Sequence, residues 1–159
     1  MEEQQKDYAG FWLRFVAYII DAVILSVAEF FLIIPALGYL GMNFALLEKN
    51  QWEGIEAELL IPALISAGSG IYLSAFLISW LYFALFESGP RQGTIGKMAV
   101  GIEVTDMEGN RINFAKASLR YFGKIISSAI LMIGYIMAGL TERKQALHDI
   151  IANALVVRK

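Results

Sequence analysis

The chain alternates between long apolar segments and shorter polar ones. Apolar runs cover about residues 11–34, 59–86 and 119–140, and the first two end at Pro35 and at Glu87-Ser-Gly-Pro90. A helix needs ~20 mostly apolar residues to cross ~30 Å of hydrocarbon. The pattern therefore predicts an all-α membrane protein, a single domain over residues 1–159. It has two full transmembrane helices and a third segment that either crosses or re-enters.

Between the second and third runs lies a small element with a strand-like pattern. Residues 98–105 are β-branched and partly alternating, and Asp106-Met-Glu-Gly-Asn110 reads as a turn. This predicts a cytoplasmic hairpin over about residues 97–113. A second β-prone run, Ala154-Leu-Val-Val157, can pair with it only if both lie on one side of the membrane.

The third apolar run leaves two topologies open. It begins with Arg120 and Lys124 and contains small residues that permit a break. A full crossing puts the C-terminal tail outside, although the tail is basic; its cations are Arg143, Lys144, Arg158 and Lys159. A re-entrant segment keeps the tail inside, as the positive-inside rule favours.

Charge in the connecting segments predicts the orientation. The segment between the first two runs is acidic and should face away from the cytoplasm. Residues 87–118 hold four cations and should be cytoplasmic; these are Arg91, Lys97, Arg111 and Lys116. Two crossings separate them from the N-terminus, which is then cytoplasmic too.

Composition narrows the class further. The chain is 57% hydrophobic and 18% charged, with mean hydropathy +0.56, whereas soluble domains are about 45–50% apolar. A net charge of −2 gives no reason to expect nucleic acid as a partner. The absence of cysteine excludes disulfides and a cysteine nucleophile, and a single histidine cannot build a histidine-based metal site. We expect no enzyme activity, no catalytic residue, no metal and no cofactor.

Two charged residues in the first run are the leading candidates for function. Asp21 is about nine residues into the run, ~13 Å deep and close to the midplane. A charge there costs at least ~2.5–3.5 kcal/mol, so Asp21 must face protein or water. Arg14 lies on nearly the same helix face but ~10 Å away along the axis, too far for a relaxed contact. Asp21 is either an ion or proton site or a polar clamp for helix docking.

Other candidates lie outside the first run. Gly93-Thr94-Ile-Gly96-Lys97 predicts a tight turn next to the membrane. Asp149 follows the only histidine. It either has a structural role, in which it caps a short helix or pairs with Arg143 or Lys144, or it belongs to a cytoplasmic gate or proton relay.

These motifs together resemble the RDD family of small bacterial membrane proteins, named for one arginine and two aspartates. The opening residues Tyr8 to Asp21 resemble its first helix, with Arg14 at the start. Gly93 to Lys97 is similar to its glycine-rich turn, with Ile95 where the family usually has proline. Arg120 followed by Gln145-Ala-Leu-His-Asp149 resembles the closing motif, in which Asp149 would be the second aspartate. The resemblance covers nearly the whole chain and implies a role in transport with no settled substrate.

The leading functional hypothesis is a transporter component of the bacterial cytoplasmic membrane, ion- or proton-coupled through Asp21. Three segments are few for a transport path, so we expect the lipid-embedded chain to form a homo-oligomer or join a larger complex. The alternative is a membrane assembly or scaffold subunit in which Arg14, Asp21 and Asp149 only set helix packing.

Overall fold

A computed structural model describes residues 7–51, 57–129 and 133–159, with only the backbone described for residues 40, 43–51, 57–60, 63 and 133. The chain divides into two compact units. The first combines Met1–Val23 with Trp80–Lys159, and the second is Ile24–Ser79. The first unit holds every element except the C-terminal part of the first long helix and the N-terminal part of the second.

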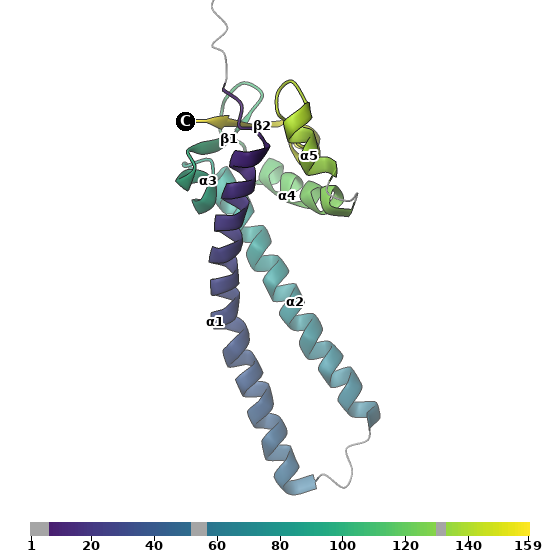
Figure 1. Cartoon of the computed structure of the whole chain (residues 1–159). Helices are drawn as coiled ribbons and strands as arrows, with labels where there is room; N and C mark the ends of the chain where they lie inside the picture. Colours follow the sequence, from purple (N-terminus) through teal and green to yellow (C-terminus); the bar gives the residue numbers. More distant parts are fainter. Residues whose placement is uncertain (1–6, 52–56, 130–132) are drawn as a thin grey trace, which may run out of the picture. The chain divides into compact units, whose positions relative to one another are not determined.

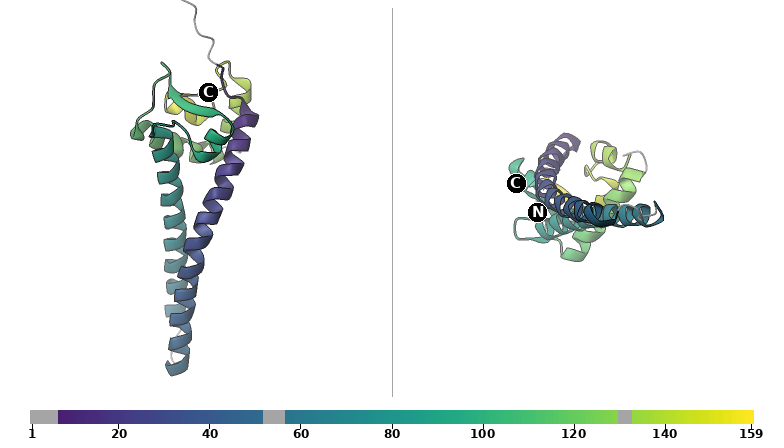
Figure 2. Two further views of the ribbon diagram at one scale, coloured as in Figure 1. Left: turned by 90° about the vertical axis from the view of Figure 1, so that its left-hand side faces the viewer. Right: turned by 90° about the horizontal axis from the view of Figure 1, so that it is seen from below.

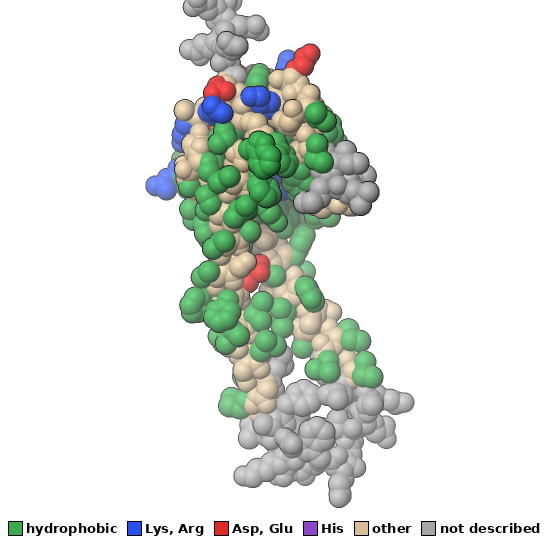
Figure 3. Space-filling view, in the orientation of Figure 1, with side chains coloured by type: hydrophobic (Ala, Val, Ile, Leu, Met, Phe, Trp, Pro, Cys, Tyr) green, Lys and Arg blue, Asp and Glu red, His purple; other side chains and the backbone are tan. Residues whose placement is uncertain are grey.

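The second unit consists of the C-terminal part of α1 (Phe11–Gln51) and the N-terminal part of α2 (Ala57–Ser88). Phe11–Tyr39 and Leu64–Ser88 are long and apolar enough to cross a membrane. In Figure 3 most of the side chains coloured along the two helices are hydrophobic. The two transmembrane helices expected from the sequence are confirmed.

One boundary was wrong, because α1 continues through Pro35 to Gln51. Proline removes a backbone donor and its ring crowds the preceding turn, which favours a helix end in water. In hydrocarbon, however, a broken helix would leave several polar backbone groups without partners. Glu53 and Glu56 of the predicted acidic loop lie outside the described residues.

The first unit contains a sheet made from three distant parts of the chain. Strand β1 (Ile102–Asp106) pairs antiparallel with β2 (Ala154–Arg158), with Val104 opposite Val156. The segment before α1 joins them, since Tyr8 forms a bridge with Val157 and the amide of Ala9 donates to Val156 at 2.8 Å. Figures 1 and 2 show the chain's C-terminus beside the start of α1.

The expected hairpin over residues 97–113 has its turn but no second strand. The Asp106 carboxylate accepts hydrogen bonds from the amides of Glu108 and Asn110, at 3.0 and 2.7 Å, and closes the turn. A single bridge then joins Thr105 to Arg111. The strand partner of β1 is β2 instead, because the apolar C-terminal run covers more of β1 than Arg111-Ile-Asn can.

The third apolar segment forms two helices rather than one. α4 (Phe114–Ala129) and α5 (Ile133–Leu140) are bent by 99° relative to each other. Gly134 lies against α4, where an added Cβ would come within 2.6 Å of Ser127 Oγ. The small residues noted in the sequence therefore mark a close contact between the two helices.

A short helix and a small core complete the first unit. α6 (Leu147–Ile151) precedes β2, and α3 (Ile95–Ala99) precedes β1. The buried core around the sheet consists mainly of small and β-branched residues; it includes Ala9, Ile102, Val104, Ile112, Ala117, Ala152, Ala154 and Val156. Small side chains allow the helices and the sheet to approach closely.

The strand register can be tested in a chain that has no natural cysteine. Glu103 and Val157 are direct partners, and opposite Cβ atoms lie ~4.5–5.5 Å apart. We expect Glu103→Cys with Val157→Cys to form an intramolecular disulfide under mild oxidation, seen as a mobility shift that reductant reverses. Each single variant should show no shift, as should Glu108→Cys with Val157→Cys. Absence of the cross-link in folded protein would contradict the pairing.

Candidate functional site

Asp21 holds the segment that follows α2 against α1. Its Oδ1 accepts hydrogen bonds from the Tyr82 hydroxyl at 2.8 Å and the Gly96 amide at 2.7 Å. Its Oδ2 accepts one from the Thr94 hydroxyl at 2.6 Å. The carboxylate is 1% exposed and has donors on both oxygens. We call Asp21, Tyr82, Thr94 and Gly96 the aspartate latch.

The latch depends on glycine at position 96. A Cβ there would overlap the carbonyl oxygen of Ala17 and lie 2.8 Å from Cγ of Asp21. Ala17 is one turn before Asp21 on the same face of α1, and it is 1% exposed. Two small residues thus let backbone approach backbone, which brings the Gly96 amide within reach of the carboxylate. Gly93 is also tightly packed, 3.3 Å from Ile102 O for an added Cβ.

The same turn starts α3 and places Lys97. The Thr94 side chain caps α3 by accepting from the Lys97 amide at 3.4 Å. Lys97 then directs its ammonium group to the Glu87 carboxylate, with which it forms a buried ion pair. All four predicted turn residues therefore belong to the site, either by close packing or by direct polar contact.

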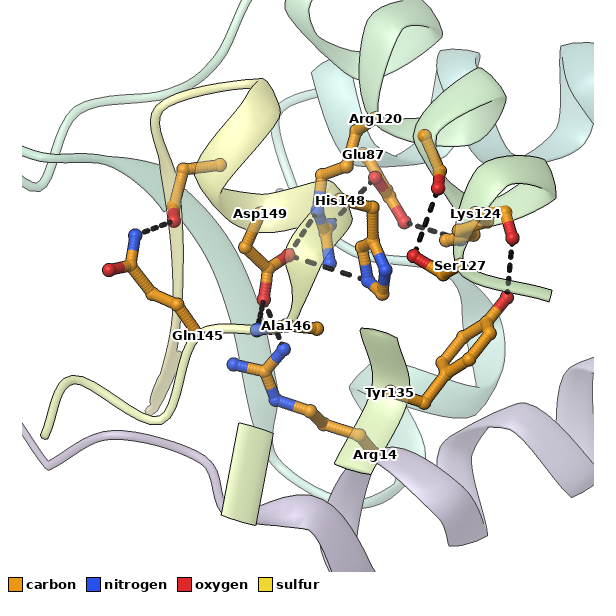
Figure 4. Close-up of polar contacts among 12 residues, drawn as sticks. Arg14, Glu87, Arg120, Lys124, Ser127, Tyr135, Gln145, Ala146, His148 and Asp149 are labelled. Carbon is orange, nitrogen blue, oxygen red and sulfur yellow. Dashed lines mark hydrogen bonds and ion pairs between the residues drawn. The ribbon is translucent and has the colours of Figure 1, made fainter. Parts of the chain in front are cut away.

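Glu87 and Asp149 are linked through Arg120 (Figure 4). Arg120 donates from Nη1 to Glu87 at 2.8 Å and from Nε to Asp149 at 2.7 Å. All three side chains are at most 2% exposed. Lys124 lies one turn along α4, with its ammonium 3.6 Å from Glu87 and 3.7 Å from the centre of the Phe83 ring.

Arg14 lies at the other end of this series of ion pairs, next to Asp149. It forms an ion pair with Asp149 and donates to the carbonyls of Ala9, at 2.9 Å, and Lys144, at 2.7 Å. Asp149 also accepts from the Ala146 amide at 3.1 Å, which caps α6. We call the set of Arg14, Glu87, Lys97, Arg120, Lys124 and Asp149 the ionic cluster.

The cluster fixes the charge state of α6. Burial opposes ionisation of Asp149, but the neighbouring Arg120 and Arg14 outweigh it and hold the pKa of Asp149 well below its usual value. The pKa of the preceding residue, His148, is also lowered, by burial, to about 3, so the imidazole is neutral near pH 7. The stable anion in this helix is therefore Asp149.

Lys97, which lies outside the long helices, has a pKa close to neutral pH. Burial lowers the pKa of Lys97 most; Glu87 raises it, and Arg120 and Lys124 lower it further, to about 7. Below that pH the ammonium holds its proton, and above it the amine is neutral. Lys97 can therefore take up and release a proton at physiological pH.

The structure separates the candidates that the sequence had placed together. Arg14 and Asp21 make no direct contact with each other: Arg14 pairs with Asp149, and Asp21 with the latch. Of the partners of Asp21, Thr94 and Gly96 follow the end of α2 at Ser88, whereas Tyr82 lies within α2. The position of Asp21 near the membrane midplane stays a prediction.

Four site residues were not among the candidates chosen from the sequence: Tyr82, Glu87, Arg120 and Lys124. Three of them carry a charge within or at the end of an apolar run, which is the signal that could have found them. Glu87 was read as the end of the second run and the two cations as the start of the third. Within the described ranges, no three acidic or histidine side chains gather to hold a metal ion.

Comparison with known proteins gives a consistent family. A model of the RDD family matches residues 8–153. An uncharacterized protein of Bacillus subtilis, YxaI, is 37% identical over 95% of this chain and 97% of its own length. An uncharacterized membrane protein of the same organism, YteJ, is 27% identical over 96% of this chain and 82% of its own length. No solved structure gives a significant match.

Enlarging Gly96 tests the latch. Gly96→Ala inserts a methyl group against backbone atoms of α1, and such overpacking costs ~1–3 kcal/mol. We expect the melting temperature of the detergent-solubilised protein to fall by roughly 2–12 °C, measured by size-exclusion chromatography after heating. Gly139→Ala is the matched control, since its Cβ meets Phe11 at an ordinary 3.8 Å. Equal melting temperatures for the two variants would argue against the close approach.

Proposed function

The chain belongs to the RDD family, and from this premise we propose that it is a component of a membrane transporter coupled to an ion or proton through the ionic cluster. The two membrane-capable helices and the name of the YteJ relative support the membrane setting. The transport role is carried by one observation, which is the imbalance of charge inside the cluster.

The ionic cluster contains more cations than anions. Arg14, Lys97, Arg120 and Lys124 surround two carboxylates, those of Glu87 and Asp149, which leaves a surplus of two positive charges. Charges removed from water are costly unless they are paired. Two events reduce the surplus: a proton leaves Lys97, which removes one positive charge, or an anion arrives. Both events are the kind of step that couples an ion to a conformational change.

The aspartate latch provides a route from that step to the membrane helices. Lys97 follows Gly96 directly, and the Gly96 amide is bonded to Asp21 of α1. Lys97 also holds Glu87, at the end of α2. A change in the charge of Lys97 therefore acts on its ion pair with Glu87 of α2, directly beside the contact of Gly96 with Asp21 of α1. Asp21 remains a candidate coupling residue in this proposal, because it binds the amide of the residue that precedes Lys97.

One observation favours the alternative, a non-catalytic assembly or scaffold subunit. Asp21 has hydrogen-bond donors on both oxygens and is buried, which suits a permanent clamp as well as a coupling residue. In that case the ionic cluster sets the fold alone. Both functions are non-enzymatic, and in both the chain acts as a homo-oligomer or as a subunit of a larger complex.

We propose the bacterial cytoplasmic membrane as the location, with the N-terminus in the cytoplasm. The basic residues of the central segment and of the C-terminal tail belong to one structural unit. A single cytoplasmic position for that unit satisfies the positive-inside rule for both segments. The difficulty that the basic tail posed for a three-crossing arrangement is then removed.

Replacement of Lys97 by arginine tests proton coupling. Lys97→Arg keeps a cation beside Glu87, but arginine does not release its proton below pH ~12. In proteoliposomes containing a pH-sensitive dye, we expect the native protein to move protons with a pH profile centred near 7. We expect Lys97→Arg to lose that dependence. Lys159→Arg, in an exposed position, should behave as the native protein, and an identical profile for Lys97→Arg would contradict the proposal.

The variant Asp21→Asn distinguishes transport from scaffolding. Asn Oδ1 can still accept from Tyr82 and Gly96, and its amide can donate to the Thr94 hydroxyl, so the change removes charge with little loss of hydrogen bonding. For a transporter we expect a normal protein level and at least tenfold slower proton flux in the same assay. A scaffold should instead show a lower protein level or weaker complex formation with no specific change in flux. Unchanged flux at normal level would sink the coupling role of Asp21.

A further inference from the structure

The apolar face of α4 points away from the rest of the first unit. Its buried positions are spaced three or four residues apart: Ala117, Arg120, Gly123 and Ser127. Two of these, Arg120 and Ser127, are polar. The opposite face is exposed and apolar, formed by Phe114, Leu119, Phe122, Ile125 and Ile126, each 40–52% exposed. This is the reverse of a helix on a water-soluble protein, which turns its polar face outward.

The sheet restricts where α4 and α5 can lie. The segment before α1, strand β1 and strand β2 are hydrogen-bonded to one another, so all three are on one side of the membrane. α4 and α5 lie between β1 and β2 in the chain. The chain leaves the sheet before α4 and returns to it after α5. Because both ends of this segment lie on the same side, the pair cannot make a single membrane crossing.

Length leads to the same result. At 1.5 Å per residue, the 16 residues of α4 extend ~24 Å and the 8 residues of α5 ~12 Å. Neither helix alone reaches across ~30 Å of hydrocarbon. The bend of 99° and the contact of Gly134 with Ser127 prevent them from adding their lengths in one direction.

We propose that α4 and α5 form a non-crossing helical pair whose apolar face is embedded in the acyl region of one bilayer leaflet, so that the chain crosses the membrane twice. The occupant of the exposed face is lipid, since α4 is continuous with a unit whose two long helices enter the same bilayer. Trp80 of α2 borders this face: its indole donates to Ser118 at 3.1 Å, and its ring lies 6.0 Å from that of Phe122. This inference rests on strand pairing and on α4, and it does not depend on transport.

Such an arrangement gives the ionic cluster a defined position. The inner face of α4 carries Arg120 and Lys124 to Glu87 and Asp149, while its outer face meets hydrocarbon. The helix therefore shields these charges from lipid on one side. The cluster then lies at the boundary between the leaflet and the folded unit on the membrane surface.

Cysteine labelling tests the number of crossings. Single cysteines are introduced at three exposed positions: in the turn after β1 (Glu108→Cys), after α5 (Glu142→Cys) and at the C-terminus (Lys159→Cys). Each variant is treated with an impermeant maleimide in sealed vesicles of both orientations. We expect all three to react from the same side. Reaction of Glu142→Cys or Lys159→Cys from the side opposite to Glu108→Cys would overturn the proposal.

Spin labels test what covers the apolar face. In proteoliposomes, labels at Phe122→Cys and Ile126→Cys should be accessible to oxygen, which concentrates in hydrocarbon, and protected from a water-soluble nickel reagent. A label at Glu108→Cys should show the reverse. Access of the nickel reagent to the α4 labels would mean that the face is in water. Exclusion of both reagents would mean that protein, such as a second copy, covers it, and either result would overturn the proposal.

Discussion

The buried ion pairs of Asp149 are the interaction on which the rest of the first unit depends. Asp149 is fully buried and binds both Arg14 and Arg120, and Arg120 continues to Glu87. This joins α6, α1, α4 and α2. Such pairs contribute little net stability compared with an apolar core. Removal of one partner, however, leaves the other charge buried and unpaired, which costs about 3–5 kcal/mol. The arrangement therefore specifies one way of docking four helices more than it strengthens that docking.

Local pattern predicted the elements of this protein better than it predicted their partners. The two long helices follow from apolar length, and the need of Asp21 for a partner other than Arg14 follows from helical spacing. The identity of that partner could not be found this way, because Thr94 and Gly96 lie more than 70 residues along the chain. Pro35 shows the opposite error, since a strong local signal for a helix end had no effect in a segment where the backbone has no water to bind.

The family residues divide into two sites, not one. Arg14 and Asp149 belong to the ionic cluster, whereas Asp21 belongs to the latch, and the glycine-rich turn connects them. Thr94 and Gly96 bind Asp21, and Lys97, next in the chain, binds Glu87. Periodicity alone places Arg14 and Asp21 on one helix face and suggests a shared role. In the structure it is the glycine-rich turn that connects the two sites, because its residues contact both Asp21 and Glu87.

This placement explains why the turn is the natural position for a switch. Each end of the turn is held by a carboxylate, one on α1 and one at the end of α2, and Asp21 interacts through neutral donors while Glu87 interacts through cations. Hydrogen bonds from neutral groups to Asp21 persist whatever the state of Lys97. The attraction between Lys97 and Glu87 does not, because it requires the proton. A loss of that proton would weaken the contact of the turn with Glu87, while its hydrogen bonds to Asp21 of α1 and to Tyr82 of α2 remain, and this asymmetry is what a directed movement requires.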